Sequence, residues 1–132
     1  MTNRMIAAAG LLCLTAAIPV ARCDDADNAR ARLNAARNVY NGMIEQARTS
    51  YRLADSEQLY LWSRRWMDAE RDLATKEADR FAAVEGHFDR MKKWEEFTRE
   101  AVRKGFAAPI DLTAQEFYRL EAEQWLARAK AK

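Results

Sequence analysis

Glycine and proline are scarce in this sequence, with four and two residues respectively among 132. Both residues interrupt helices and dominate turns, so their scarcity argues against a fold built from many short strands and turns. Alanine, glutamate, arginine and leucine are abundant and β-branched residues are few beyond residue 23. This composition favours helix and leaves little that would form a sheet. The sequence therefore predicts an all-α protein.

Acidic residues are absent from the first 23 positions. Arg4 is followed by an apolar run from Met5 to Val20 that contains no charge, which is the layout of a secretory signal peptide. A retained membrane anchor is the alternative, but this run is shorter than the ~20 apolar residues that span a bilayer. We therefore expect a signal peptide over 1–23, cleaved near residues 21–23, and an exported protein that is periplasmic or secreted.

Only two cysteines are present, Cys13 and Cys23, and Cys13 lies inside the expected signal peptide. The expected mature chain therefore has no internal disulfide. If cleavage falls before Cys23, its thiol survives and could cross-link two chains in an oxidising compartment. Val20-Ala21-Arg22-Cys23 can also be interpreted as a lipoprotein box that tethers a lipidated Cys23 to a membrane, although Arg22 stands where a small residue is normally needed.

The net charge after the signal peptide is zero. Of the 22 basic residues only Arg4 and Arg22 precede residue 24, which leaves 20 basic residues against 20 acidic ones over 24–132. This balance gives no support for nucleic acid or an anionic membrane as the partner. The length after residue 23 corresponds to a single helical domain over 24–132.

Apolar residues recur at alternating steps of four and three, which is the pattern of a coiled-coil seam. The first such stretch predicts a helix over 25–54. The second predicts a helix over 56–104, which no proline interrupts, with Asp55 or Ser56 as its N-cap. Within it, the four-plus-four step between Leu73 and Phe81 is a stutter, which locally unwinds a supercoil.

A third helix is expected after a turn. Gly105 follows the last turn of the second helix, and Pro109 marks the start of a helix over 110–128. The central helix is then about as long as the two shorter ones together. We expect an elongated antiparallel helical hairpin with the shorter helices end to end along the long one, or a three-helix coiled-coil bundle.

Groupings of residues that carry chemistry are few. His87 is the only histidine, and its neighbouring acids Glu85 and Asp89 lie on different faces of the helix, so we expect a solvated or flanking histidine without a metal. A glycine-rich phosphate loop and a serine elbow motif are both missing from the sequence. We therefore expect no catalytic, metal-binding or cofactor-binding residues and no enzymatic activity.

The most distinctive local cluster contains two tryptophans and two arginines. Trp62 and Trp66 lie one helical turn apart, so both can face the first helix, while Arg64 and Arg65 project elsewhere. One interpretation is a protein-contact site formed by Tyr60, Trp62, Arg64, Arg65 and Trp66. The other is a layer of the core with guanidinium groups stacked beside it.

Three apolar residues of the same stretch do not fit the seam, namely Tyr60, Leu61 and Met67. In a simple hairpin they would be exposed. Their pattern therefore indicates either contact with the helix over 110–128 or self-association.

The turn before the third helix resembles part of a known family. A pattern similar to the helix-turn-helix of TolC-type outer-membrane efflux proteins is formed by Arg103-Lys104-Gly105-Phe106, Pro109, Asp111-Leu112, Ala114 and Leu120-Glu121-Ala122. In that family such a stretch opens a long tunnel helix. The match is confined to the C-terminal third, and the β-barrel strands and repeated second half of that family are missing here, so the resemblance implies no tunnel.

A wider pattern is similar to a group of uncharacterised small exported bacterial proteins. It comprises Leu59-Tyr60, Trp62-Ser63-Arg64-Arg65-Trp66, Glu70-Arg71 and Tyr118-Arg119-Leu120-Glu121-Ala122-Glu123. This resemblance implies export but no activity. A further stretch, Leu112-Thr113-Ala114-Gln115-Glu116, is similar to the L-T-x-x-Q marker of Spy- and CpxP-type periplasmic chaperones, with the glutamine one position early.

These observations lead to one expectation and one alternative. We expect an exported, non-enzymatic helical protein that acts through contacts with a protein partner, or with itself, in the cell envelope. Membrane contact is expected only through the signal segment or a lipidated Cys23. The alternative is a Spy- or CpxP-like periplasmic chaperone or stress sensor.

Overall fold

The computed structural model describes residues 21–50 and 52–131, and these residues form four α-helices and no strand. The helices are α1 (Ala21–Ser50), α2 (Ser56–Leu73), α3 (Glu77–Arg103) and α4 (Pro109–Lys130). The predicted all-α class is therefore confirmed. The expected signal peptide lies outside the described residues up to position 20. None of the described helices is long and apolar enough to cross a membrane.

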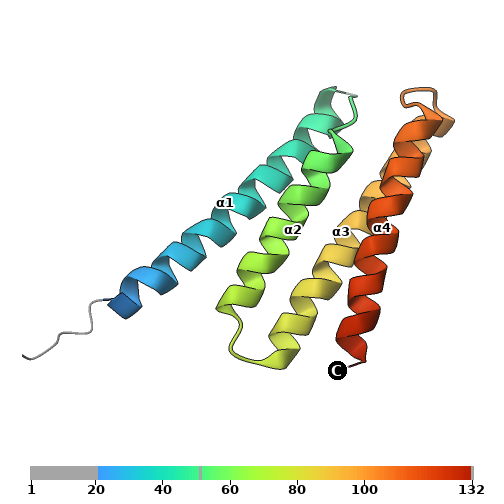
Figure 1. Cartoon of the computed structure of the whole chain (residues 1–132). Coiled ribbons are helices and arrows are strands. Elements are labelled where there is room, and N and C mark those ends of the chain that lie inside the picture. Colours follow the sequence, from blue (N-terminus) through green and yellow to red (C-terminus); the bar gives the residue numbers. More distant parts are fainter. Residues whose placement is uncertain (1–20, 51, 132) are drawn as a thin grey trace, which may run out of the picture.

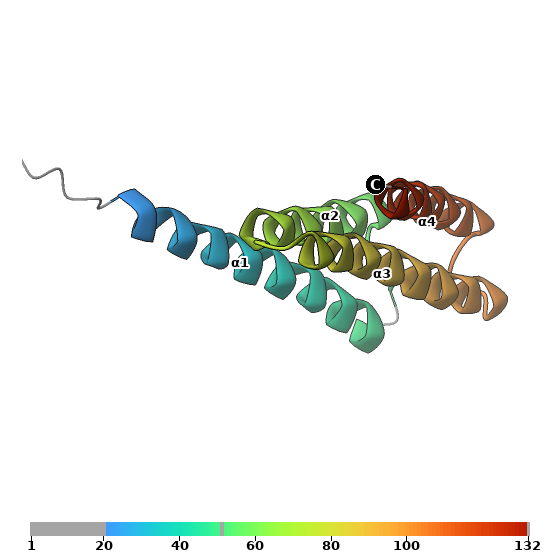
Figure 2. The ribbon, with the colours of Figure 1, turned by 90° about the horizontal axis from the view of Figure 1, so that it is seen from below.

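The helices run up and down in chain order (Figure 1). α1 packs on α2, α2 on α3, and α3 on α4, and α2 also contacts α4. In the view from below, α1 and α4 again lie at opposite edges of the molecule (Figure 2). The bundle is therefore open, with α2 and α3 in the middle and an edge helix on each side.

The predicted single helix over 56–104 is wrong, because the chain reverses in the middle of this stretch. α2 ends at Leu73 and α3 starts at Glu77. Between them, Ala74 and Lys76 have extended backbones with ψ angles of 125° and 149°. The turn falls at the stutter that the sequence shows between Leu73 and Phe81.

Burial of apolar surface accounts for this reversal. A straight helix of nearly fifty residues would extend over about 70 Å and could pack only on α1 and α4. After the reversal, Met67 of α2 forms a small core with Ala83 and Val84 of α3 and Leu126 of α4. The charges at the turn also suit two helix ends, since Arg71 lies in the last turn of α2 and Glu77 in the first turn of α3.

The expected partner of each half is retained despite the reversal. The first helix packs on the first half of the predicted long helix, and the last helix packs on its second half. The result is neither an end-to-end hairpin nor a three-helix bundle, because the two halves also pack on each other. Four antiparallel helices replace the three that the sequence predicts.

The first helix, predicted over 25–54, spans Ala21–Ser50, so its predicted end is wrong. The local signals at Asp55, Gly105 and Pro109 do lie at the turns that they predict. Asp55 caps α2, since its side chain accepts a hydrogen bond from the backbone N–H of Gln58 at 2.9 Å. Gly105 has a φ angle of 78° in the turn between α3 and α4, a conformation that favours glycine. Pro109 is the first residue of α4, and the N–H of Ala108 donates to Asp111 at 2.9 Å.

A larger core lies between the helices above the α2–α3 turn. Its fully or nearly buried members are Tyr40, Ala47, Leu59, Tyr60, Met91, Trp94 and Ala122. All four helices contribute to it, so the bundle is one packed unit. Aromatic side chains make up much of this core, and they also form the surroundings of the candidate sites described below.

Candidate functional site

Two of the three residues that do not fit the predicted seam, Tyr60 and Met67, are buried against the last two helices, and Leu61 is partly buried. Tyr60 stacks on Tyr118 of α4, with ring centroids 4.6 Å apart and an angle of 20° between the planes. Its hydroxyl donates a hydrogen bond to the carboxylate of Glu121. Burial, followed by this hydrogen bond, raises the pKa of Tyr60 to about 12. Tyr60 thus makes the predicted contact with the helix over 110–128.

The two tryptophans of the cluster face α1, as the sequence predicts. Trp66 meets Tyr40 of α1 edge to face at a centroid distance of 5.7 Å, and its Nε1 donates to Glu70 at 2.7 Å. Trp62 lines a hollow together with Ala36 of α1. Both rings are half-buried, so most of each is used in packing.

The two arginines of the cluster are exposed and stack on aromatic rings. The guanidinium of Arg65 lies 4.5 Å from the ring centre of Trp62, and that of Arg64 lies 5.1 Å from the ring centre of Trp125 in α4. This is the stacking that the core-layer interpretation expects. Among the five residues predicted to contact a partner, Arg64 and Arg65 are therefore the most accessible, and Tyr60 is buried.

A buried polar network joins α2 and α3 beside these rings. The side chains of Ser63 and His87 are fully buried, and Ser63 Oγ lies 2.8 Å from His87 Nδ1. Arg90 donates to the hydroxyl of Ser63 through Nε at 2.8 Å and to its carbonyl through Nη2 at 3.1 Å. The expectation of a solvated or flanking His87 is therefore wrong.

Aromatic rings enclose both His87 and Arg90. His87 stacks on Trp125 at a centroid distance of 5.6 Å. The guanidinium of Arg90 lies 4.0 Å from the ring centre of Trp66 and 5.9 Å from that of Tyr40. Burial, followed by the positive charges of Arg90 and Arg64, lowers the pKa of His87 to about 3. His87 is therefore neutral at physiological pH.

The Ser63–His87 pair has the distance of a nucleophile and its base, but its surroundings differ from those of a catalytic pair. Both side chains are enclosed, so a substrate cannot approach the hydroxyl. A cationic donor, Arg90, occupies the position beside Ser63 where a reacting group would have to bind. The network therefore fixes the packing of α2 on α3.

An ion-pair chain connects α3 to α4. The carboxylate of Glu95, which is only 5% exposed, accepts hydrogen bonds from Arg119 Nε and Arg99 Nη2, each at 2.5 Å. Arg119 also binds Glu123 at 2.6 Å. Phe88, Met91 and Glu95 follow one another at steps of three and four residues in the predicted seam. The arginine from α4 explains how the acid at position 95 can be accommodated there.

The outer face of α4 carries an apolar stripe. We define the α4 stripe as Ile110, Phe117 and Leu120, which are 71%, 62% and 54% exposed. Their spacing of seven and three residues places them on one side of the helix. Phe106, in the turn that leads into α4, is 61% exposed. The apolar residues of this helix form a broad stripe in the sequence, which does not separate the exposed Phe117 and Leu120 from the buried Leu126.

The described part of the chain shows no group of three or more histidine, cysteine, aspartate or glutamate side chains placed to hold a metal ion. Comparisons of the chain with the models of known protein families, with curated proteins and with solved structures find no match.

Proposed function

We propose that this chain is an exported, non-enzymatic protein that binds another protein in the cell envelope through the α4 stripe. The observation that carries the proposal is the exposure of Ile110, Phe117 and Leu120 on one face of an edge helix. Large apolar side chains clustered on the surface of a folded domain are typical of protein-binding sites. A helix face of this kind fits an apolar groove or a second apolar helix.

The position of α4 supports this role. α4 packs on α3 and touches α2, and it lies at an edge of the open bundle (Figure 1). Its stripe is therefore accessible to a partner without any rearrangement of the four helices. Arg64 and Arg65 are further accessible candidates for contact, since aromatic–arginine stacks are frequent at interfaces.

Export is supported by the sequence over 1–23 alone, where an uncharged apolar run follows Arg4 and precedes the first acid at Asp24. The proposed location is the periplasm or the medium, with lipidation of Cys23 as the alternative that would tether the protein. We propose no enzymatic role because Ser63 and His87, the one serine–histidine pair among the described residues, are enclosed.

Cross-linking in cells, followed by ultracentrifugation of the purified exported form, tests the proposal. We expect the wild type to yield a discrete cross-linked product, either with a partner or with a second copy. A variant with Ile110→Ser, Phe117→Ser and Leu120→Ser should lose it. Val39→Ser is the matched control, because Val39 is an exposed apolar residue on α1, away from the stripe.

A wild-type protein that gives no product and sediments as a monomer would contradict the proposal. Loss of the product in Val39→Ser as well would show that the stripe has no special role. Circular dichroism of each variant checks that the helices are intact.

The alternative is a chaperone of the Spy or CpxP type, which the same stripe would serve by binding unfolded clients. It predicts that the purified protein suppresses the aggregation of a reduced or heat-unfolded client at stoichiometric ratio. A discrete partner together with no effect on aggregation would favour the first function.

A further inference from the structure

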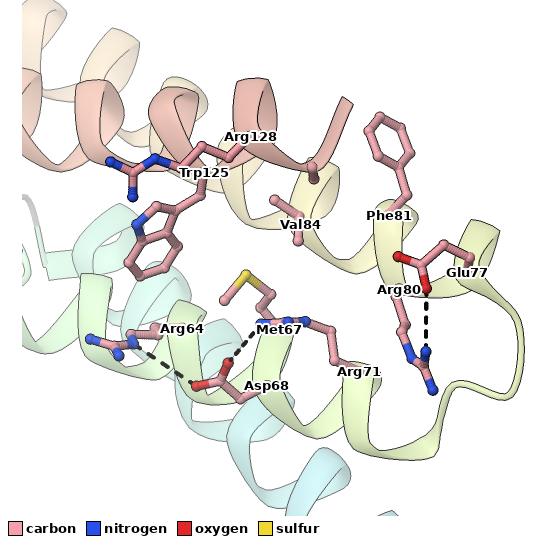
Figure 3. Close-up of a pocket in the computed structure, with 11 residues that line it drawn as sticks. Arg64, Met67, Asp68, Arg71, Glu77, Arg80, Phe81, Val84, Trp125 and Arg128 are labelled. Atoms are coloured by element: carbon pink, nitrogen blue, oxygen red, sulfur yellow. Dashed lines mark hydrogen bonds and ion pairs between the residues drawn. The ribbon is translucent and has the colours of Figure 1, made fainter. Parts of the chain in front are cut away.

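A cleft of about 440 Å³ opens between α2, α3 and α4 beside the α2–α3 turn (Figure 3). Four arginines from three helices line it, namely Arg64, Arg71, Arg80 and Arg128. Its volume lies within the range of about 300–1,000 Å³ that is usual for small-molecule sites. We propose that this cleft binds an amphipathic organic anion, with a carboxylate head on an apolar body.

The charge of the lining favours an anion. Arg64 and Arg71 share the carboxylate of Asp68 at 3.9 and 3.8 Å, and Arg80 pairs with Glu77 at 3.2 Å. Arg128 makes no ion pair with any described residue. Four arginines against two acids leave two positive charges in the cleft.

Helix ends reduce this charge but do not cancel it. The C-terminal ends of α2 and α4 and the N-terminal end of α3 lie at the same end of the bundle (Figure 1), and each contributes residues to the cleft, among them Arg71, Arg128 and Glu77. Each C-terminal end contributes about −0.5 charge and the N-terminal end about +0.5. The lining therefore remains positive by more than one charge, and its guanidinium groups suit a carboxylate because they can donate two parallel hydrogen bonds.

Apolar side chains form part of the cleft wall. Phe81 and Trp125 are partly exposed there, whereas Met67 and Val84 are buried and belong to the small core. The indole of Trp125 projects from α4 into the space between Arg64 and Met67 (Figure 3). An inorganic anion would leave the apolar surface of the cleft exposed to water, whereas an aliphatic or aromatic group attached to the anion would cover it.

The cleft and the α4 stripe are separate surfaces. The stripe begins at Ile110, at the end of α4 farthest from the α2–α3 turn, and Arg128 lies near the other end (Figure 1). The inference thus goes beyond the proposed protein contact, and either can fail without the other.

Calorimetric titration of the full exported protein with decanoate tests the inference. We expect saturable binding at one site. Decanol, which has the same chain length without the charge, and decyltrimethylammonium should bind at least about tenfold more weakly, the ratio that corresponds to loss of one hydrogen bond to a charged group. Equal binding of decanol and decanoate would overturn the inference.

Arg128→Gln should weaken decanoate binding by about tenfold. Lys130→Gln is the matched control, since Lys130 lies in the same last turn of α4 and does not line the cleft. A second pair of variants places a carboxylate on α4. Ala129→Glu, inside the cleft, should abolish binding, whereas Ala127→Glu, on the exposed face, should not.

Two other outcomes would also overturn the inference. A groove of about 310 Å³ between α1 and α3 is lined by Arg48 and Arg52 among other residues, and sensitivity of decanoate binding to Arg48→Gln and Arg52→Gln, with none to Arg128→Gln, would place the anion there. Binding to phosphatidylglycerol vesicles without binding of free decanoate would identify a lipid surface as the ligand. Retained binding in the triple stripe variant is expected.

Discussion

Ser63 Oγ and His87 Nδ1 lie 2.8 Å apart, and neither side chain is exposed to solvent. Burial and the nearby charges of Arg90 and Arg64 lower the pKa of His87 to about 3, whereas an unfolded chain has a histidine pKa of about 6.5. The folded state therefore keeps His87 neutral at a pH where the unfolded state already binds a proton.

This difference makes stability depend on pH. The contribution of neutral His87 to the free energy of unfolding is fully present above about pH 6.5. It is lost as the pH falls from 6.5 toward 3, by about 1.4 kcal/mol per pH unit. We expect the free energy of unfolding in urea to be about 2 kcal/mol lower at pH 5 than at pH 7.5. His87→Gln should remove this difference, and an equal pH dependence in the variant would contradict the prediction.

The two arginines that bind Glu95 should differ in their effect on stability. Arg119→Met leaves a buried carboxylate without its partner from α4 and should cost about 2–3 kcal/mol, the range for losing a hydrogen bond to a charged group while Arg99 remains bound. Arg99 has an exposed side chain and binds the same carboxylate from one helical turn away, so Arg99→Met should cost about 0.5 kcal/mol. Urea unfolding at pH 7.5 measures the stability of both variants. Equal losses of stability would show that the contact of Glu95 with Arg119 of α4 contributes no more than its contact with Arg99.

Alanine substitutions at Gly105 and Gly42 should change the stability of the protein in opposite directions. An added Cβ would meet no atom within 4 Å at either position, so only the backbone matters. Gly105 has a φ angle of 78°, and Gly105→Ala should cost about 1–2 kcal/mol. Gly42 lies inside α1, and Gly42→Ala should stabilise by about 0.5–1 kcal/mol. Thermal unfolding of the pair decides whether the signs differ.

A proline at position 77 distinguishes the observed turn from a continuous helix. Glu77 is the first residue of α3, and Lys76 before it has φ −112° and ψ 149°, the conformation that proline favours in its predecessor. Glu77→Pro should therefore cost less than about 1 kcal/mol, including its exposed ion pair with Arg80.

The control for this variant is Ala82→Pro, at an exposed position inside α3, which should cost about 3 kcal/mol or more. Urea unfolding followed by circular dichroism measures both variants. Similar large losses at positions 77 and 82 would mean that the helix continues through residue 77.

The sequence predicts the α3–α4 turn well and the α2–α3 turn not at all. Gly105 and Pro109 are local signals, because the chain conformation that each favours is the one found. The stretch Ala74-Thr75-Lys76 contains neither glycine nor proline, and the N-cap residue Lys76 makes no side-chain capping bond. The turn there depends on core packing between residues that are distant in the sequence. Only the stutter and the charges at the helix ends indicate it in the sequence.

The burial of His87 does not follow from a single apolar seam. That seam includes Phe88 and Met91, but α3 packs on both α2 and α4 and therefore buries a wider face, which takes in Ala83, His87 and Trp94. The same applies to the arginine cleft. Arg71, Arg80 and Arg128 come from three helices, and only the reversal at residues 74–76 brings them together.

The up-and-down order of the helices has a consequence for how the chain reaches its structure. Each main interface joins helices that follow one another in the chain, so no interface requires a long loop to close first. Bundles with such local contacts fold within microseconds to milliseconds. Rapid formation of the native bundle leaves the apolar faces of its unpaired helices exposed only briefly, which limits the time in which newly made chains can aggregate.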